Sequence, residues 1–104
     1  MISHVVHQTI SNAKQYPHIT KIGIFGSYAR NEQSEASDLD ILIDYDNVSD
    51  DFIDNLGDFM EDMALVFEGK IDYVTIPGIM GSNDAIFRHN VLQDVKWIYS
   101  VDKV

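Results

Sequence analysis

Two short groups of residues in the first half of the chain have side chains and a spacing suited to chemistry on phosphates. Gly26 and Ser27 end an apolar run, and after ten intervening residues Asp38 and Asp40 stand on either side of Leu39. A serine hydroxyl and free backbone N–H groups at a helix start can bind phosphate. Carboxylate oxygens are the ligands that magnesium prefers. Together the two groups indicate a site that binds phosphate at one end and metal at the other.

The aspartates lie in segment 38–46, DLDILIDYD, whose alternation of polar and apolar residues predicts a β-strand. Alternate side chains of a strand point to one face, so Asp38 and Asp40 share a face with Leu42 and Asp44. The two carboxylates are then roughly 6 to 7 Å apart along the strand, a distance that one or two hard cations can bridge. An isolated Asp-x-Asp pair, however, is more commonly the solvated face of an edge strand.

The Gly-Ser pair ends segment 20–26, TKIGIFG, a short apolar run that predicts another strand. Ser27 begins a turn that residues 28–30 can continue as a short helix, which would point several N–H groups at a common spot. Alone, the pair is more often an ordinary turn, with glycine for backbone freedom and serine as a cap. Neither simple interpretation explains why the Gly-Ser pair and the Asp-Leu-Asp group stand at the two ends of one short connection between strands that are expected to be neighbours.

The rest of the pattern predicts a single α/β domain over residues 1–104, with about three strands in a mixed sheet and flanking helices. Ser49 is the expected cap of the middle helix, with Asp50 and Asp51 in its first turn. Helical spacing and short apolar runs predict the order helix 2–13, strand 20–26, a short turn or helix, strand 38–46, helix 52–67, strand 69–77 and a last helix from about Ser82 to Ile98.

Charge and composition restrict the partners of such a domain. The 104 residues include 17 acidic and 7 basic side chains, for a net charge of −10, which would repel a nucleic acid backbone and favours a basic protein partner. There is no cysteine, and therefore no disulfide framework or thiolate zinc site. No segment resembles a signal peptide or a membrane span, so we expect a cytoplasmic protein.

The spacing of Gly26-Ser27 and Asp38-Leu39-Asp40 resembles the nucleotidyltransferase signature of the DNA polymerase β superfamily. Essentially the whole chain resembles its smallest members, the minimal nucleotidyltransferases or MNT proteins, which have a three-stranded sheet with flanking helices. The resemblance implies that the Gly-Ser loop holds a nucleotide triphosphate and that the two aspartates bind magnesium. It also implies a third carboxylate on the next strand, where Asp72 stands in KIDYVTI.

One position departs from the family pattern, and two others admit a second interpretation. Asn31 stands where the family pattern has glycine, and asparagine is among the few other residues that tolerate a left-handed backbone. Arg30 belongs to the recurring pattern and is the nearest cation to the expected triphosphate, but a solvated arginine on a helix face explains it equally well. Asp72 would be a solvent-facing strand residue if it had no role in the site.

The resemblance implies a transfer of AMP from ATP, with two magnesium ions, to a hydroxyl of a partner. In the family, minimal nucleotidyltransferases act as antitoxins that transfer AMP to a tyrosine of a HEPN-domain ribonuclease toxin, so a hetero-oligomer with such a toxin is expected. This chain has no room for the small-molecule domain of longer members, so the acceptor must arrive on another molecule. The competing hypothesis is a binding module that inhibits its partner by contact. Transfer to RNA ends is disfavoured by the charge.

Overall fold

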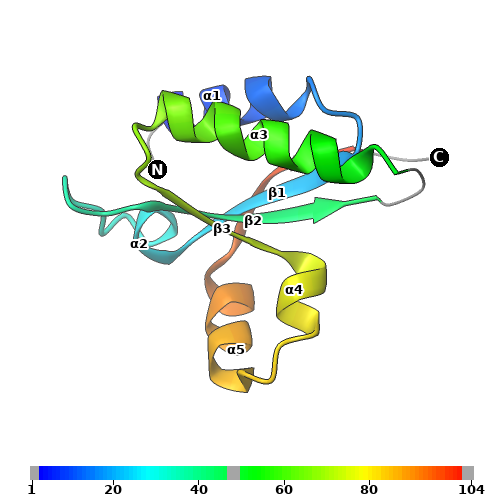
Figure 1. Cartoon of the computed structure of the whole chain (residues 1–104). Helices are drawn as coiled ribbons and strands as arrows, with labels where there is room; N and C mark the ends of the chain where they lie inside the picture. Colours follow the sequence, from blue (N-terminus) through cyan, green and yellow to red (C-terminus); the bar gives the residue numbers. More distant parts are fainter. Residues whose placement is uncertain (1–2, 47–49, 102–104) are drawn as a thin grey trace.

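The computed structural model describes residues 3–46 and 50–101, which form one mixed sheet with helices on both of its faces (Figure 1). The elements in chain order are α1 Ser3–Ala13, β1 Ile19–Phe25, α2 Gly26–Ala29, β2 Leu39–Tyr45, α3 Phe52–Val66, β3 Ile71–Thr75, α4 Ile76–Met80, α5 Ala85–Asp94 and β4 Lys96–Ser100. The predicted α/β class is therefore confirmed.

The sheet has the strand order β3-β2-β1-β4. The central strand β1 runs antiparallel to both β2 and β4, whereas β2 and β3 are parallel and are joined by the crossover through α3. Antiparallel β1 therefore ends at the same edge of the sheet at which β2 and β3 begin. This edge brings together the end of the Gly-Ser strand and the starts of both aspartate strands.

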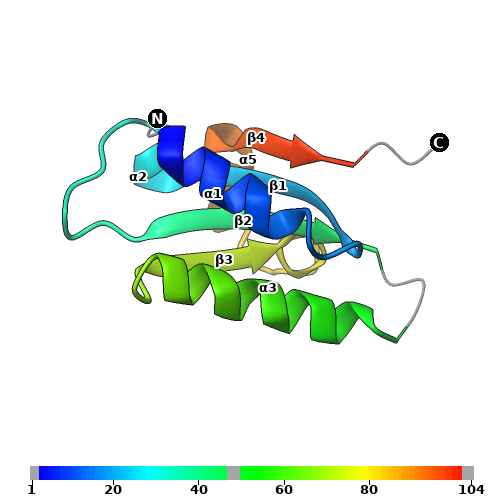
Figure 2. The same ribbon diagram turned by 90° about the horizontal axis from the view of Figure 1, so that it is seen from above.

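Helices α1 and α3 lie side by side across one face of the sheet (Figures 1 and 2). Both helices have apolar stripes, and α3 contributes Phe59 and Met63, which are fully buried. Opposite them, the sheet presents apolar side chains from its central strands. The main core contains Ile22 and Ile24 of β1 and Leu39, Ile41 and Ile43 of β2.

The opposite face of the sheet is covered by α4 and α5, which stand below it in Figure 1. Their smaller core consists of Phe25, Leu42, Ile79 and Val91. Leu42 is fully buried although it shares its face of β2 with Asp40. A wholly solvated aspartate face, the simpler interpretation of the strand, is therefore wrong. Only part of this face of β2 is accessible to solvent.

The C-terminal part of the chain differs from the prediction, because the sheet has four strands rather than three. The last helix ends at Asp94 instead of Ile98, and Val95 adopts an extended backbone. The run Lys96–Ser100 then pairs with β1 as β4. Aromatic and β-branched residues in this run suit a strand, and β1 would otherwise present an unpaired edge. Ile98, which continues the helical spacing of Ile86, Leu92 and Val95 in the sequence, instead packs on the main core together with Tyr99.

The start of α3 also differs in detail from the prediction. Ser49, the expected cap, lies outside the described residues, and the residue that precedes the helix is Asp51. Asp50 and Asp51 therefore stand before the first turn rather than in it, where Asp54 is found. No helix in the two described segments is long and apolar enough to cross a membrane, and the cytoplasmic location stays a prediction.

Candidate active site

The Gly-Ser loop lies directly against one of the predicted metal-binding carboxylates. Gly26 follows the last residue of β1 and begins α2 with a φ of +71°, a left-handed conformation that glycine adopts at little cost. A Cβ atom built on Gly26 would collide with the carboxylate of Asp40. Glycine is therefore strongly favoured at this position for two reasons, the backbone angle and the space that the Asp40 carboxylate occupies.

Ser27 follows as the second residue of α2 and is half-buried. Its carbonyl oxygen accepts a hydrogen bond of 2.9 Å from the N–H of Glu32, and the carbonyl of Gly26 accepts one of 3.2 Å from Arg30. Between these bonds Asn31 has a φ of +57°. The prediction that asparagine replaces glycine in a left-handed position is confirmed. The two hydrogen bonds that close the loop form although residue 31 is not the glycine of the family pattern.

The sheet register places the carboxylates next to one another. Asp40 on β2 pairs with Phe25 on β1 and with Asp72 on β3, so it lies between the Gly-Ser loop and the third carboxylate. Neighbouring strands are about 4.8 Å apart. Asp38 precedes β2 and is exposed, as is Asp72, while Asp40 is half-buried. The three aspartates singled out from the sequence thus meet at one edge of the sheet.

The pKa of Asp40 reflects this crowding. Burial raises the pKa of its carboxyl above the ordinary value, and the negative charges of Asp72 and Asp38 raise it further. The positive charge of Arg30 acts in the opposite direction. The carboxylates are therefore within electrostatic reach of one another, and their mutual repulsion is only partly neutralised by the protein.

This donor set fits a divalent cation in its chemistry. Oxygen ligands of high negative charge are what magnesium binds, and it commonly uses only one or two carboxylates together with water and substrate phosphates. As the side chains are placed, no group of three or more histidine, cysteine or carboxylate residues in segments 3–46 and 50–101 is arranged to hold a metal ion. The uncompensated charge at Asp40 is the feature that a cation would relieve.

Arg30 occupies a position that the sequence did not reveal. Its guanidinium donates a hydrogen bond of 3.0 Å from Nε to Glu32 and one of 2.6 Å from Nη1 to Asp94. Asp94 is the last residue of α5, so the arginine joins the Gly-Ser loop to the helix below the sheet. Sequence reasoning missed Asp94 because the two residues are 64 positions apart, and no local signal links them.

Comparison with known proteins identifies the family to which this fold and site belong. The model of the family described as Polymerase beta, Nucleotidyltransferase matches residues 7–104. The chain belongs to this nucleotidyltransferase family. A relative from Methanocaldococcus jannaschii, named "Putative protein adenylyltransferase", is 39% identical over 75 residues, which are 71% of this chain and 74% of the relative. As a member of this family with relatives named adenylyltransferases, the protein is a nucleotidyltransferase.

Solved structures agree with this assignment at the level of the fold. A chain from the crystal structure of a toxin-antitoxin with AMP-PNP matches with a TM-score of 0.67 and 18% identity, covering 93% of this chain and 74% of that one. A chain from the complex of a tri-AMPylated Shewanella oneidensis HEPN toxin with an MNT antitoxin matches with a TM-score of 0.64 and 18% identity, covering 97% and 74%.

Proposed function

We propose that this protein is a magnesium-dependent enzyme that transfers AMP from ATP to a hydroxyl, that of a tyrosine, on a HEPN-domain toxin, and that it acts as the antitoxin of that toxin. One observation carries the proposal, namely that Gly26 abuts Asp40 while Asp72 lies beside Asp40 on the parallel strand. The groups that we propose to bind phosphate and metal, separate in the sequence, are adjacent in the fold. The relatives named adenylyltransferases and the toxin-antitoxin structures support the same reaction.

In the proposed reaction, the acceptor oxygen attacks the α-phosphorus of ATP. A new P–O bond forms, the bond from the α-phosphorus to the bridging oxygen of the β-phosphate breaks, and pyrophosphate leaves with that electron pair. Nucleotidyl transfer requires above all that the phosphates be held in line and the developing charge be neutralised. Gly26 and Ser27 would hold the triphosphate through backbone N–H groups and a hydroxyl, and Arg30 would supply a positive charge beside it.

The carboxylates of Asp38, Asp40 and Asp72 would hold magnesium, which supplies charge neutralisation for the triphosphate and acidifies the attacking hydroxyl. A free tyrosine hydroxyl keeps its proton at neutral pH. Asp72 is exposed and, unlike Asp38 and Asp40, lies on the edge strand β3, so we assign it the role of assisting removal of that proton. Asp40 is half-buried between the Gly-Ser loop and Asp72. From this position its carboxylate would bind a magnesium ion close to both the triphosphate and Asp72.

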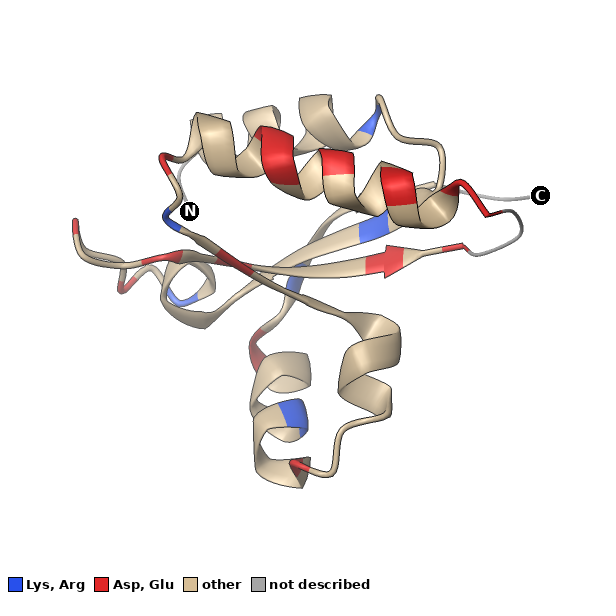
Figure 3. Cartoon of the chain, in the orientation of Figure 1, with Lys and Arg blue, Asp and Glu red and all other residues tan. Residues whose placement is uncertain are grey.

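The charge of the molecule supports a protein partner. Acidic residues recur along α3 (Figure 3), and the side chains of Asp54, Asp58 and Glu61 on this helix are exposed. A toxin that binds RNA needs positive charge against the phosphate backbone, and opposite charges steer two proteins together. The same acidic surface also favours the second candidate function, in which the protein inhibits its partner by contact and transfers nothing.

Covalent modification and contact make different predictions after the two proteins are separated. The experiment incubates the chain with ATP, magnesium and the HEPN protein encoded beside it, removes the chain, and then measures the mass and ribonuclease activity of the HEPN protein. We expect a mass increase by one or more AMP groups and lasting inactivation. The double variant Asp38→Asn/Asp40→Asn should bind the partner and produce neither result, whereas Asp44→Asn, a change on the same strand away from the site, should behave as wild type.

The contact hypothesis gives the opposite pattern. If the double variant protects cells as well as wild type, and the partner's mass is unchanged with either protein, the transferase proposal is wrong. The acidic surface would then be the neutralising feature.

A further inference from the structure

An apolar pocket of about 360 Å³ opens at the outer edge of β3, between α3 on one face of the sheet and α4 and α5 on the other. Its walls include Met60 of α3, Tyr73 and Val74 of β3, Ile79 of α4, Ser82, and Phe87 of α5. In the described residues β3 pairs only with β2, so this side of the strand faces away from the sheet.

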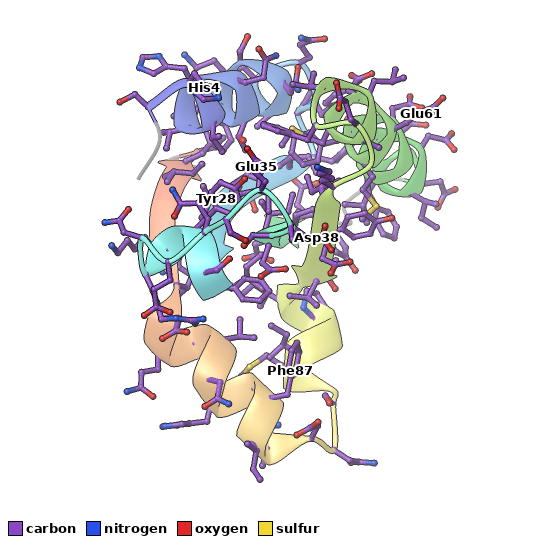
Figure 4. All side chains as sticks on the ribbon, turned by 90° about the vertical axis from the view of Figure 1, so that its left-hand side faces the viewer. His4, Tyr28, Glu35, Asp38, Glu61 and Phe87 are labelled. Atoms are coloured by element: carbon purple, nitrogen blue, oxygen red, sulfur yellow. The ribbon has the colours of Figure 1, made fainter. Side chains whose placement is uncertain are left out.

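The pocket begins next to the candidate active site. Tyr73 directly follows Asp72, and Val74 is the next residue on the same face of the strand as Asp72, roughly 6 to 7 Å further along. Figure 4 views the molecule from the end where the site lies and shows Phe87 below Asp38, in the space between α4 and α5. A molecule seated in the pocket would therefore be within reach of Asp72.

The order of the strands determines from which side an acceptor can approach. Gly26 and Ser27 follow β1, Asp40 lies on β2, and Asp72 lies on β3, so the phosphate loop and Asp72 are on opposite sides of Asp40. The attacking and leaving oxygens of nucleotidyl transfer are roughly in line. With pyrophosphate leaving on the Gly26 side, the acceptor hydroxyl must arrive on the β3 side, where the pocket opens.

The surface around the pocket differs from the rest of this acidic chain. Tyr73 and Phe87 line the pocket and remain 44% and 40% exposed. Figure 3 shows acidic residues gathered along α3 and few charges on α4 and α5. Apolar pockets within protein interfaces commonly receive one large apolar side chain from the partner, and such anchors contribute much of the binding energy.

We propose that this pocket docks an apolar side chain of the acceptor protein and so places the acceptor hydroxyl beside Asp72. The inference rests on the proposed transferase function and adds to it the surface that selects the acceptor. The occupant is the protein acceptor rather than the nucleotide, because the pocket lies beyond Asp72, on the side of Asp40 opposite the phosphate loop.

The test compares Phe87→Ala with Leu65→Ala. Leu65 on α3 is also apolar, is 76% exposed and does not line the pocket, so it is a matched control. For each variant, AMP transfer is measured against the concentration of the HEPN protein at saturating ATP, and AMP-PNP binding is measured by calorimetry. We expect Phe87→Ala to raise the KM for the acceptor about tenfold, the effect of losing one interface anchor. The AMP-PNP affinity should not change, and Leu65→Ala should alter neither quantity.

A further variant, Phe87→Leu, keeps an apolar wall and should restore most of the acceptor affinity. Thermal unfolding of each variant shows that a change in KM does not come from loss of the fold. An unchanged acceptor KM in Phe87→Ala, with transfer by wild type intact, would overturn the pocket inference alone. Weakened AMP-PNP binding would assign the pocket to the nucleotide and also overturn it. Failure of wild type to transfer AMP would overturn both the proposed function and this inference.

Discussion

The two faces of the sheet are built from the same strands but contain different kinds of residues. Toward α1 and α3, β2 presents Leu39, Ile41 and Ile43, each at most 1% exposed. Toward α4 and α5, it presents Asp40, Leu42 and Asp44, of which only Leu42 is buried. Successive side chains of a strand alternate between faces. One segment therefore supplies stabilising residues to one layer and charged residues to the other.

This division explains how the chain keeps mutually repelling carboxylates together. The pKa of Asp40 is raised by burial and by its charged neighbours, so its ionised form destabilises the native state. The main core on the opposite face holds β2 and β3 in register regardless of that repulsion. We therefore expect changes on the α4–α5 face to alter activity more than stability, and changes on the α1–α3 face to do the reverse.

The largest effect is expected for Asp40→Asn. Transfer should fall by about 10³-fold, because a ligand for the cation is lost at the centre of the site. The free energy of unfolding should be unchanged or slightly higher, because the substitution removes a charge that Asp72 and Asp38 repel. Transfer kinetics and urea unfolding measure the two quantities. Asp44→Asn is the control. Wild-type turnover by Asp40→Asn would show that Asp40 is not part of the active site.

The next largest effect concerns Gly26→Ala. The new Cβ would meet the Asp40 carboxylate, and alanine is strained at a φ of +71°. We expect transfer to fall by about a hundredfold, since small misplacements of reacting groups have effects of that order. The strain should lower the free energy of unfolding by about 1–3 kcal/mol.

The matched control for that glycine is Gly57→Ala, in the middle of α3, where an added Cβ meets no atom within 4 Å. It should stabilise the protein by about 0.5–1 kcal/mol because alanine loses less backbone freedom on folding. Transfer should be unaffected. Nucleotide binding by Gly26→Ala that equals that of wild type would mean the loop is only a turn.

A smaller effect is expected for Arg30→Gln. The guanidinium is shared between Glu32 and Asp94, so only part of its charge is directed toward the candidate site. We expect the KM for ATP to rise by roughly threefold to tenfold, less than for the loss of a full charge-assisted hydrogen bond, because the charge is shared. Steady-state kinetics at varied ATP provide the measurement. Arg88→Gln is the control for removing a positive charge, and an equal change in both variants would show a general charge effect only.

The smallest effect on activity is expected on the α1–α3 face, for Tyr16→Phe. The hydroxyl of Tyr16 donates a hydrogen bond to Asp62 of α3, and this bond, with burial, raises the pKa of Tyr16 to about 12. Removing it should lower the free energy of unfolding by about 1–2 kcal/mol and leave transfer unchanged.

The raised pKa of Tyr16 also gives a pH signature. The folded tyrosine holds its proton more tightly than the unfolded one, whose pKa is about 10. Its stabilising contribution is therefore fully present below pH 10 and is lost as the pH rises toward 12. Unfolding measured across this range should show a steeper loss of stability in wild type than in Tyr16→Phe. Parallel curves would mean that the hydrogen bond does not form.

Much of the fold could be predicted because its signals are local. The apolar run ending at Gly26 and the alternation that follows Asp38 predicted β1 and β2 within a residue or two. The end of the chain was predicted less well, because Ile98 suits a helix stripe as well as a strand. Pairing of Lys96–Ser100 with β1 depends on an edge formed by residues more than 70 positions earlier, and no local pattern carries that information.

The candidate site divides in the same way. The types of residue in the site and the spacing of Gly26, Ser27, Asp38 and Asp40 could be predicted, since they depend on order along the chain and on the geometry of one strand. Three features became visible only in the folded chain: the place of Asp40 between Gly26 and Asp72, the pairing of Arg30 with Asp94, and the apolar pocket beside Asp72. Strand register and the packing of α3, α4 and α5 against the sheet place these residues together, and both depend on contacts between residues far apart in the sequence.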